Sequence, residues 1–257
     1  MSSETSIGRR DTLRPYIYFA IILIFGLALR IYLSNYLTYY RDFNVWRGWG
    51  SQAAEVGLNN FYEIFWCDYM PGYIYVLYGL NWIHETLPWI KVEILFKLPA
   101  NLADLGLSVL IMLSLRRITS VRNSIIGGLV YFFNPAALSN STFWGQVDSF
   151  HAFPILLSIL LALDKRFLLS GIALAAAFMI KPQSIVLFPV VGFLSLGSLY
   201  GSVTGISRKD LMQPLKLILG VAVTTVLLTL PYIADDFGSF LYIFTGPVEL
   251  IRDRFDA

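Results

Sequence analysis

The chain has 257 residues, of which 56% are apolar and only 14% are charged, and its mean hydropathy is +0.64. An ordinary soluble domain carries roughly 25% charged residues, so a water-soluble fold is excluded in favour of an all-α polytopic membrane protein. The net charge of +2 is small and gives no electrostatic case for a nucleic-acid partner, and the single cysteine, Cys67, excludes an intrachain disulfide.

Seven apolar runs predict membrane-spanning helices, although several are shorter than about 20 residues. In chain order they are Tyr16–Leu37, Lys97–Leu115, Ile125–Leu138, Phe150–Leu163, Phe167–Ile180, Ser184–Leu199 and Leu215–Tyr232. The first run is too long for the core of a signal peptide and lacks an A-x-A cleavage site, so we expect it to be retained. The whole chain, 1–257, is predicted to be a single transmembrane domain.

The basic residues predict the orientation of these spans. They cluster in residues 9–14, 116–122, 165–166 and 208–216. Seven spans starting inside place all four clusters in the cytoplasm, as the positive-inside rule requires. The outward-facing segments are then 38–96, 139–149, 181–183 and the residues after about 231.

The long first outer loop, 38–96, is expected to carry helices that lie in the membrane interface. In the segment 42–56, Trp46, Trp49 and Ala53 fall on one helical face. The segment 73–87 is rich in Tyr and Trp, which are enriched at the headgroup level. The loop could instead hide two more spans, but making the segment 73–87 a span would place the basic segment 116–122 outside.

Several ionisable residues fall on or near the predicted outer side. Asp42 follows the first span and could cap a helix or act as a catalytic acid or base. Asp68 precedes a Pro-Gly turn, for which an Asx turn is the simple explanation. Arg30 lies near the outer end of the first span. Asp104 lies inside the second span, where it is either functional or paired with a lysine or the backbone.

Two further motifs carry polar groups beside aromatic rings. In "WGQVD" (144–148), Trp144, Gln146 and Asp148 suit binding of a sugar, although Asp148 could instead cap the next span. In "IKPQS" (180–184), Lys181 could snorkel to lipid phosphates or bind an anionic ligand, and Gln183 follows it. His151 is more typical of a satisfied interior histidine than of a zinc ligand.

Five segments in this order resemble the polytopic GT-C glycosyltransferases, nearest to their bacterial and archaeal mannosyltransferase-like branch, over residues 16–235. They are an acid after the first span, "DYMPGYIYVLY", "KLPANLADL", "NPAALSNSTFWGQVDSF" and "SGIALAAAFMIKPQSIVLFP". The resemblance implies a seven-span module and inverting transfer of a hexose such as mannose from a polyprenyl-phosphate donor to an extracytoplasmic acceptor (a glycan, lipid or protein). Members of this family usually continue with more spans, so the chain is expected to be a fragment or a minimal module.

The same resemblance implies roles for the outer polar residues. Asp42 matches the general base, and Asp68 the acid of a DYPPGY motif in which Met70 replaces the first proline. Trp144, Gln146, Asp148, Lys181 and Gln183 match donor-binding positions, with Arg30 as a further contact of the leaving phosphate. A divalent cation, Mg²⁺ or Mn²⁺, could be held by Asp42 or Asp68, but two carboxylates are few for a hard cation.

Two other functions compete with the transferase. A non-catalytic binding or translocation subunit for lipid-linked sugars would need no acid at position 42. An ion-coupled transporter would need ionisable residues near the midplane, where only Asp104 comes close. In each case we expect an integral membrane protein, in the plasma membrane of a prokaryote or the ER membrane of a eukaryote, with its site on the extracytoplasmic side.

Overall fold

The computed structural model describes residues 4–65, 67–200 and 208–233. The described residues are 84% helix and include no strand, which confirms the all-α class. The helices are α1 (Glu4–Leu33), α2 (Tyr40–Val56), α3 (Phe61–Ile64), α4 (Pro71–Thr86), α5 (Val92–Leu115), α6 (Val121–Phe132), α7 (Pro135–Ala137), η1 (Leu138–Trp144), α8 (Asp148–Leu163), α9 (Phe167–Ile180), η2 (Pro182–Leu187), α10 (Phe188–Tyr200) and α11 (Arg208–Ile233).

Three of the described helices are long and apolar enough to cross a membrane. The spanning segments are Leu13–Leu33 in α1, Val92–Leu115 in α5 and Leu211–Ile233 in α11. Helices α8 and α9 and the segment Pro182–Gly197 are apolar but shorter. A polytopic membrane protein is therefore consistent with the structure, whereas the predicted number of seven spans is not confirmed.

The predicted span Ile125–Leu138 is divided among several elements. Helix α6 ends at Phe132, and Asn134 begins α7 by accepting a hydrogen bond from the backbone N of Ala136 at 2.8 Å. Asparagine is a good N-cap, and a residue that precedes proline disfavours the helical conformation. The pair Asn134-Pro135 therefore ends one helix and starts the next.

The chain forms two compact units, each built from two separate stretches of sequence. Unit 1 comprises residues 1–39 and 91–153, and unit 2 comprises residues 40–90 and 154–257. Most of the predicted first outer loop thus belongs to unit 2. The prediction of a single transmembrane domain stays a prediction.

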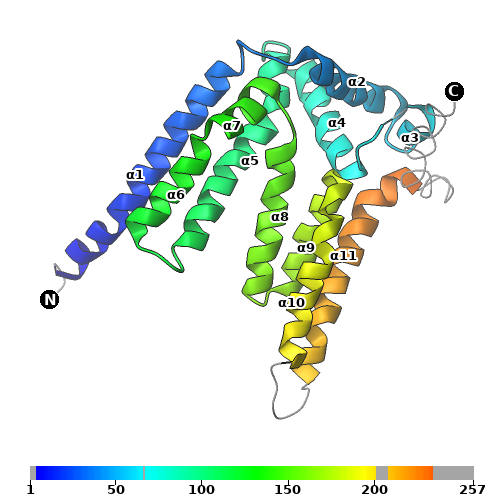
Figure 1. The fold of residues 1–257 in the computed structure, drawn as a ribbon. Coiled ribbons are helices and arrows are strands. Elements are labelled where there is room, and N and C mark those ends of the chain that lie inside the picture. Colours follow the sequence, from blue (N-terminus) through cyan, green and yellow to red (C-terminus); the bar gives the residue numbers. More distant parts are fainter. Residues whose placement is uncertain (1–3, 66, 201–207, 234–257) are drawn as a thin grey trace. The chain divides into compact units, whose positions relative to one another are not determined.

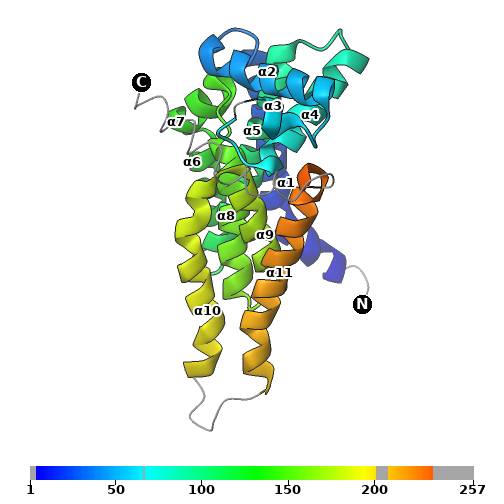
Figure 2. The ribbon, with the colours of Figure 1, turned by 90° about the vertical axis from the view of Figure 1, so that its right-hand side faces the viewer.

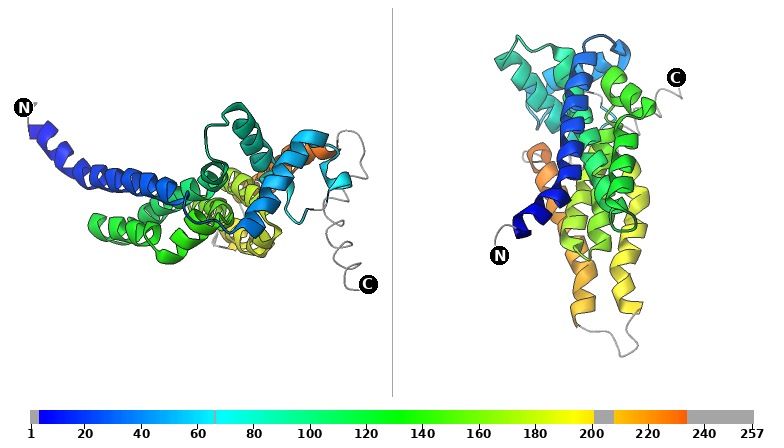
Figure 3. Two further views of the ribbon diagram at one scale, coloured as in Figure 1. Left: turned by 90° about the horizontal axis from the view of Figure 1, so that it is seen from above. Right: turned by 90° about the vertical axis from the view of Figure 1, so that its left-hand side faces the viewer.

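In unit 1, helices α1, α5 and α6 lie side by side (Figures 1 and 3). Their shared core includes Phe19, Met112 and Phe132, all less than 7% exposed. Helices α5 and α6 approach closely at Gly128, where an added Cβ would lie 2.7 Å from the carbonyl oxygen of Ser108. The Ser108 hydroxyl donates to the Gly128 carbonyl at 2.8 Å. Small residues and interhelical hydrogen bonds are the usual means of joining helices in a membrane.

In unit 2, helices α9 and α11 form a closely packed pair (Figures 1 and 2). A Cβ added to Gly171 of α9 would lie 2.3 Å from the carbonyl oxygen of Leu217 in α11. A Cβ added to Gly220 of α11 would lie at the same distance from the carbonyl oxygen of Leu168 in α9. The pair is thus in backbone contact on both sides, which only glycine permits.

Of the helices in the predicted outer loop, α4 packs against this pair and α2 packs on α4. Helix α2 buries the face that carries Trp46, Trp49 and Ala53, as their spacing predicts. Gly72 lies in the first turn of α4, where an added Cβ would lie 2.5 Å from the carbonyl oxygen of Met179 in α9. The Tyr75 hydroxyl donates to the carbonyl oxygen of Leu228 in α11 at 3.0 Å. Helix α4 therefore contacts α9 at Gly72 and α11 at Tyr75.

Candidate functional site

A buried ion pair joins α1 to α5 inside unit 1. The Nη1 atom of Arg30 lies 2.6 Å from Oδ2 of Asp104, and the two side chains are 1% and 0% exposed. The Tyr131 hydroxyl of α6 donates to the other oxygen of Asp104 at 2.8 Å. Both carboxylate oxygens are therefore engaged, as a buried charge requires.

The guanidinium group of Arg30 has further partners on three neighbouring elements. Nη2 donates to the carbonyl oxygen of Phe132, and the same group lies over the Phe132 ring at 4.4 Å. Nη1 also lies 3.4 Å from Oδ1 of Asn101 and from Oγ1 of Thr142. This network explains why a span carries an arginine, and it gives Arg30 a structural use in place of the predicted contact with a donor phosphate.

Lys97, also fully buried, caps the C-terminal end of α1. Its ammonium group donates to the carbonyl oxygens of Ser34 and Leu37 and to Oγ1 of Thr38. The last carbonyls of a helix lack partners within the helix and attract a positive charge. Gly145 lies against the stem of this lysine with φ +84°, and a Cβ there would lie 2.9 Å from Cγ of Lys97.

The segment "WGQVD" lies where the π-helix η1 meets α8. Trp144 is 41% exposed and packs on Tyr39, with ring centroids 5.0 Å apart. These two rings line a shallow hollow of about 280 Å³ in unit 1. The exposed Asp148 starts α8 and accepts a hydrogen bond from Nδ2 of Asn140 at 3.1 Å, and the backbone N of Gln146 donates to the carbonyl oxygen of Asn140. Asp148 is thus tied to the local turn.

A second polar cluster occupies unit 2 and brings together Asp42, Asp68 and Lys181. Asp42 lies in the first turn of α2, Asp68 precedes α4, and Lys181 ends α9. Partial desolvation raises the pKa of Asp68, and the negative charge of Asp42 adds to this, whereas the charge of Lys181 lowers it. Asp68 therefore lies near enough to Asp42 and Lys181, which are 26 and 113 positions away in sequence, for both charges to affect its pKa.

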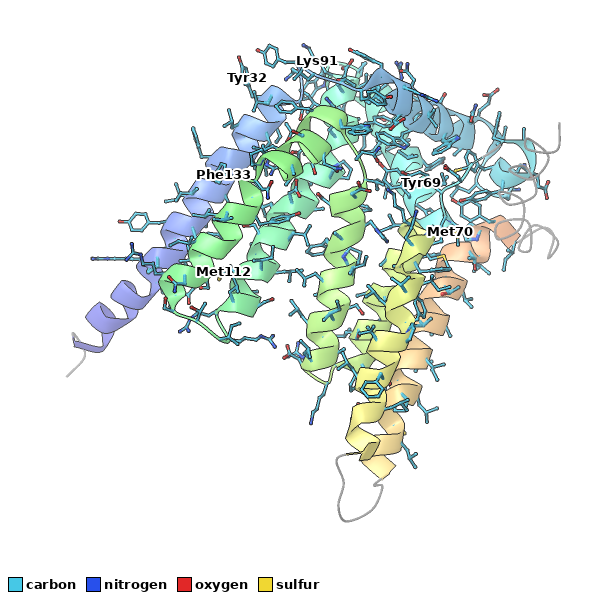
Figure 4. The ribbon with its side chains drawn as sticks, in the orientation of Figure 1. Tyr32, Tyr69, Met70, Lys91, Met112 and Phe133 are labelled. Carbon is cyan, nitrogen blue, oxygen red and sulfur yellow. The ribbon has the colours of Figure 1, made fainter. Side chains whose placement is uncertain are left out.

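Aromatic rings border this second cluster. The ammonium group of Lys181 lies 5.5 Å from the ring centroid of Tyr69, within the range of a cation–π contact. Tyr69 lies in the turn before α4 (Figure 4). Its ring packs on that of Trp49, with centroids 5.5 Å apart. Gln183 follows in η2 and is exposed. The cluster therefore presents two acids, one base and aromatic faces at one end of unit 2.

The predicted site residues thus fall into two groups. Unit 1 holds Arg30, Trp144, Gln146 and Asp148, and unit 2 holds Asp42, Asp68, Lys181 and Gln183. No group of three or more His, Cys, Asp or Glu side chains suited to a metal occurs in the part of the chain that the structure describes. Asp42 and Asp68 alone would leave most positions of a divalent cation to other ligands.

Comparison with known protein families shows which family the chain belongs to. A family model described as GPI transamidase subunit PIG-U matches residues 73–253, which is more than half of the sequence. The chain belongs to the PIG-U family. No curated protein and no solved structure matches it.

Membership of the PIG-U family corrects the resemblance to GT-C glycosyltransferases. The predicted hexose transfer, the mannosyltransferase assignment and the role in glycan biosynthesis are wrong, and a lipid-linked sugar donor is not supported. The quoted motifs are short runs of Trp, Tyr, Gly, Pro and polar residues at the ends of apolar helices. Membrane proteins place such residues there for reasons of topology.

The catalytic roles of two acids depended on that resemblance. Asp42 and Asp68 both lie before the first residue that the PIG-U model matches. The roles of Asp42 as general base and of Asp68 as catalytic acid therefore have no support from the family. The cluster of Asp42, Asp68 and Lys181 remains as a group of polar residues without an assigned catalytic role.

Sequence reasoning missed the ion pair and the lysine cap. The signal for the pair was present, because α1 carries a deeply placed Arg30 and α5 a deeply placed Asp104, and opposite charges inside a membrane commonly pair. The expected partner of Asp104 was a lysine or the backbone, but the nearby Lys97 donates instead to carbonyl oxygens at the end of α1.

Proposed function

We propose that the protein is a non-catalytic membrane subunit of a complex that attaches proteins to a GPI anchor. The observation that carries this proposal is the match of residues 73–253 to the family of GPI transamidase subunit PIG-U. The partners are then the other subunits of a transamidase and its protein substrate. The protein is integral to the membrane, as its three long apolar helices require.

The chemistry of the described residues supports an architectural role. The intramembrane charges of unit 1 serve the fold: Arg30 and Asp104 neutralise each other, and Lys97 caps α1. This arrangement also disfavours the ion-coupled transporter, because Asp104 is held between Arg30 and Tyr131. A charge engaged in this way cannot readily exchange a proton or an ion.

Within this function, we assign the cluster of Asp42, Asp68 and Lys181 to contact with a partner in the complex. Its mixed charges and aromatic rings suit a polar protein segment at the membrane surface, because charge complementarity orients partners and selects among them. By the predicted orientation, this end of unit 2 is extracytoplasmic. A cation–π contact already holds Lys181 at a fixed position.

The test uses cells that lack their own PIG-U subunit and display a GPI-anchored reporter only when the subunit is supplied. The tagged full-length chain should restore surface reporter and co-purify with the transamidase. Asp42→Asn should still restore the reporter wherever the variant co-purifies with the transamidase, because a subunit without catalytic duty needs no base at this position. Folded protein that neither co-purifies nor restores the reporter would refute the proposed function.

The cluster is tested separately by charge removal. Lys181→Gln should reduce co-purification several-fold, whereas Lys165→Gln, in the turn after α8 on the predicted cytoplasmic side, should not. Equal recovery of the complex with the two variants would assign Lys181 to lipid phosphates instead.

A further inference from the structure

An apolar groove runs between α1 and α6 in unit 1. It has a volume of about 470 Å³ and is lined by Pro15, Tyr18, Phe19 and Ile22 of α1 and by Val121, Arg122, Ile125 and Ile126 of α6. Ligand sites of this size are common, since pockets of roughly 300–1,000 Å³ hold small molecules. All but one of these residues are apolar or aromatic, and the exception is an arginine at one end.

Proline 15 explains why the groove exists. A proline inside a helix removes one backbone donor and clashes with the preceding turn, so it bends the helix. Figure 1 shows the first turns of α1 diverging from α6. Phe19, which is 4% exposed, forms the floor of the groove where the two helices come together again.

The groove lies on the lipid-facing side of a spanning helix. Tyr18 and Ile22 are 64% and 40% exposed although they belong to the apolar segment Leu13–Leu33. From Pro15 to Ile22 the groove extends about 10 Å along α1, at 1.5 Å per residue. One leaflet contributes roughly 15 Å of hydrocarbon, so this length fits the part of an acyl chain next to its headgroup.

The charges at one end of the groove indicate which lipid it holds. Arg122 lines the groove at the first turn of α6, and no described carboxylate pairs with it. Arg116 lies at the same level, since its Nε atom is 3.4 Å from the Tyr16 hydroxyl of α1. Basic pockets between membrane helices on the cytoplasmic side bind anionic headgroups. The predicted orientation places this end of unit 1 in the cytoplasm.

We propose that the groove between α1 and α6 is a binding site for one anionic phospholipid of the cytoplasmic leaflet. An acyl chain lies against Phe19, Ile22 and Ile126, and the phosphate contacts the guanidinium group of Arg122. This site is separate from the Asp42–Asp68–Lys181 cluster, and the proposal does not depend on the transamidase role.

The experiment measures lipid retained by the purified full-length chain in detergent after equilibration with palmitoyl-oleoyl phosphatidylserine or phosphatidylcholine. Native mass spectrometry counts the bound lipids. Arg122→Gln should lower phosphatidylserine retention about fivefold, the effect of one basic residue at an anionic surface. Phosphatidylcholine, which has the same phosphate but no net charge, should lose clearly less. Arg122→Lys should restore most of the loss, because the charge is what matters.

Two further variants separate the groove from general surface charge. Ile126→Trp fills the groove and should lower the retention of both lipids, whereas Arg166→Gln, which removes a basic residue in the turn before α9, should change neither. Equal loss with Arg122→Gln and Arg166→Gln would overturn the proposal. So would undiminished retention by a folded Ile126→Trp, because the groove would then hold a neighbouring helix or nothing specific.

Discussion

The buried ion pair between α1 and α5 predicts a large loss of stability when either charge is removed. Asp104→Asn removes the negative charge but keeps the size of the side chain. Arg30 is 1% exposed and would be left as an uncompensated charge, and Tyr131 would lose a charged acceptor. Breaking one side of a buried pair costs about 3–5 kcal/mol, so we expect a loss of that size in the free energy of unfolding.

A double-mutant cycle isolates the pair from its surroundings. Arg30→Met and Asp104→Leu should each destabilise strongly, but the double variant should cost less than the sum because neither charge then remains unpaired. Unfolding is measured in mixed micelles by SDS titration with circular dichroism. A loss of less than about 1 kcal/mol for Asp104→Asn, or strict additivity in the cycle, would refute a structural pair.

Two further predictions concern unit 2. Gly171→Val should disrupt the α9–α11 contact at a cost of about 1–3 kcal/mol or more, because its Cβ would lie 2.3 Å from a backbone oxygen. The matched control is Gly192→Val, since a Cβ at Gly192 meets nothing within 4 Å. Equal shifts in the thermal unfolding midpoint of the two variants would contradict the close approach. Desolvation raises the pKa of Asp68, so its charged form costs stability in the folded state at pH 7. Asp68→Asn removes this cost and should raise the unfolding midpoint at pH 7, but less so near pH 4, where the carboxyl group is largely neutral. A gain in the midpoint that does not depend on pH would contradict this cause.

The helices of the fold were largely predictable, because apolar length and basic loops are strong signals along a single stretch of chain. The division at Asn134-Pro135 was also present in the sequence as a capping and breaking signal, although the apolar character of Ile125–Leu138 concealed it. The number of spans was harder to predict, since α8 and α9 are apolar but shorter than a membrane requires.

The sequence indicated which residues belong to the candidate site, but not which of them contact one another. The pairing of Arg30 with Asp104 joins positions 74 apart and depends on how α1 meets α5, which no local pattern encodes. The function was missed for a related reason. Aromatic and polar residues beside apolar helices occur in membrane proteins of many activities, so their order alone could not separate the PIG-U family from a transferase.

The bond between the Tyr75 hydroxyl and the carbonyl oxygen of Leu228 also affects how the protein is made, because 153 residues separate the two groups. At about 5–20 residues per second, the ribosome needs roughly 8–30 s to synthesise that interval. During this time, α4 has left the ribosome while its partner α11 has not yet been made. The Tyr75 hydroxyl therefore finds its acceptor only after the other described helices have been synthesised, so the contact between α4 and α11 cannot guide the early steps of folding.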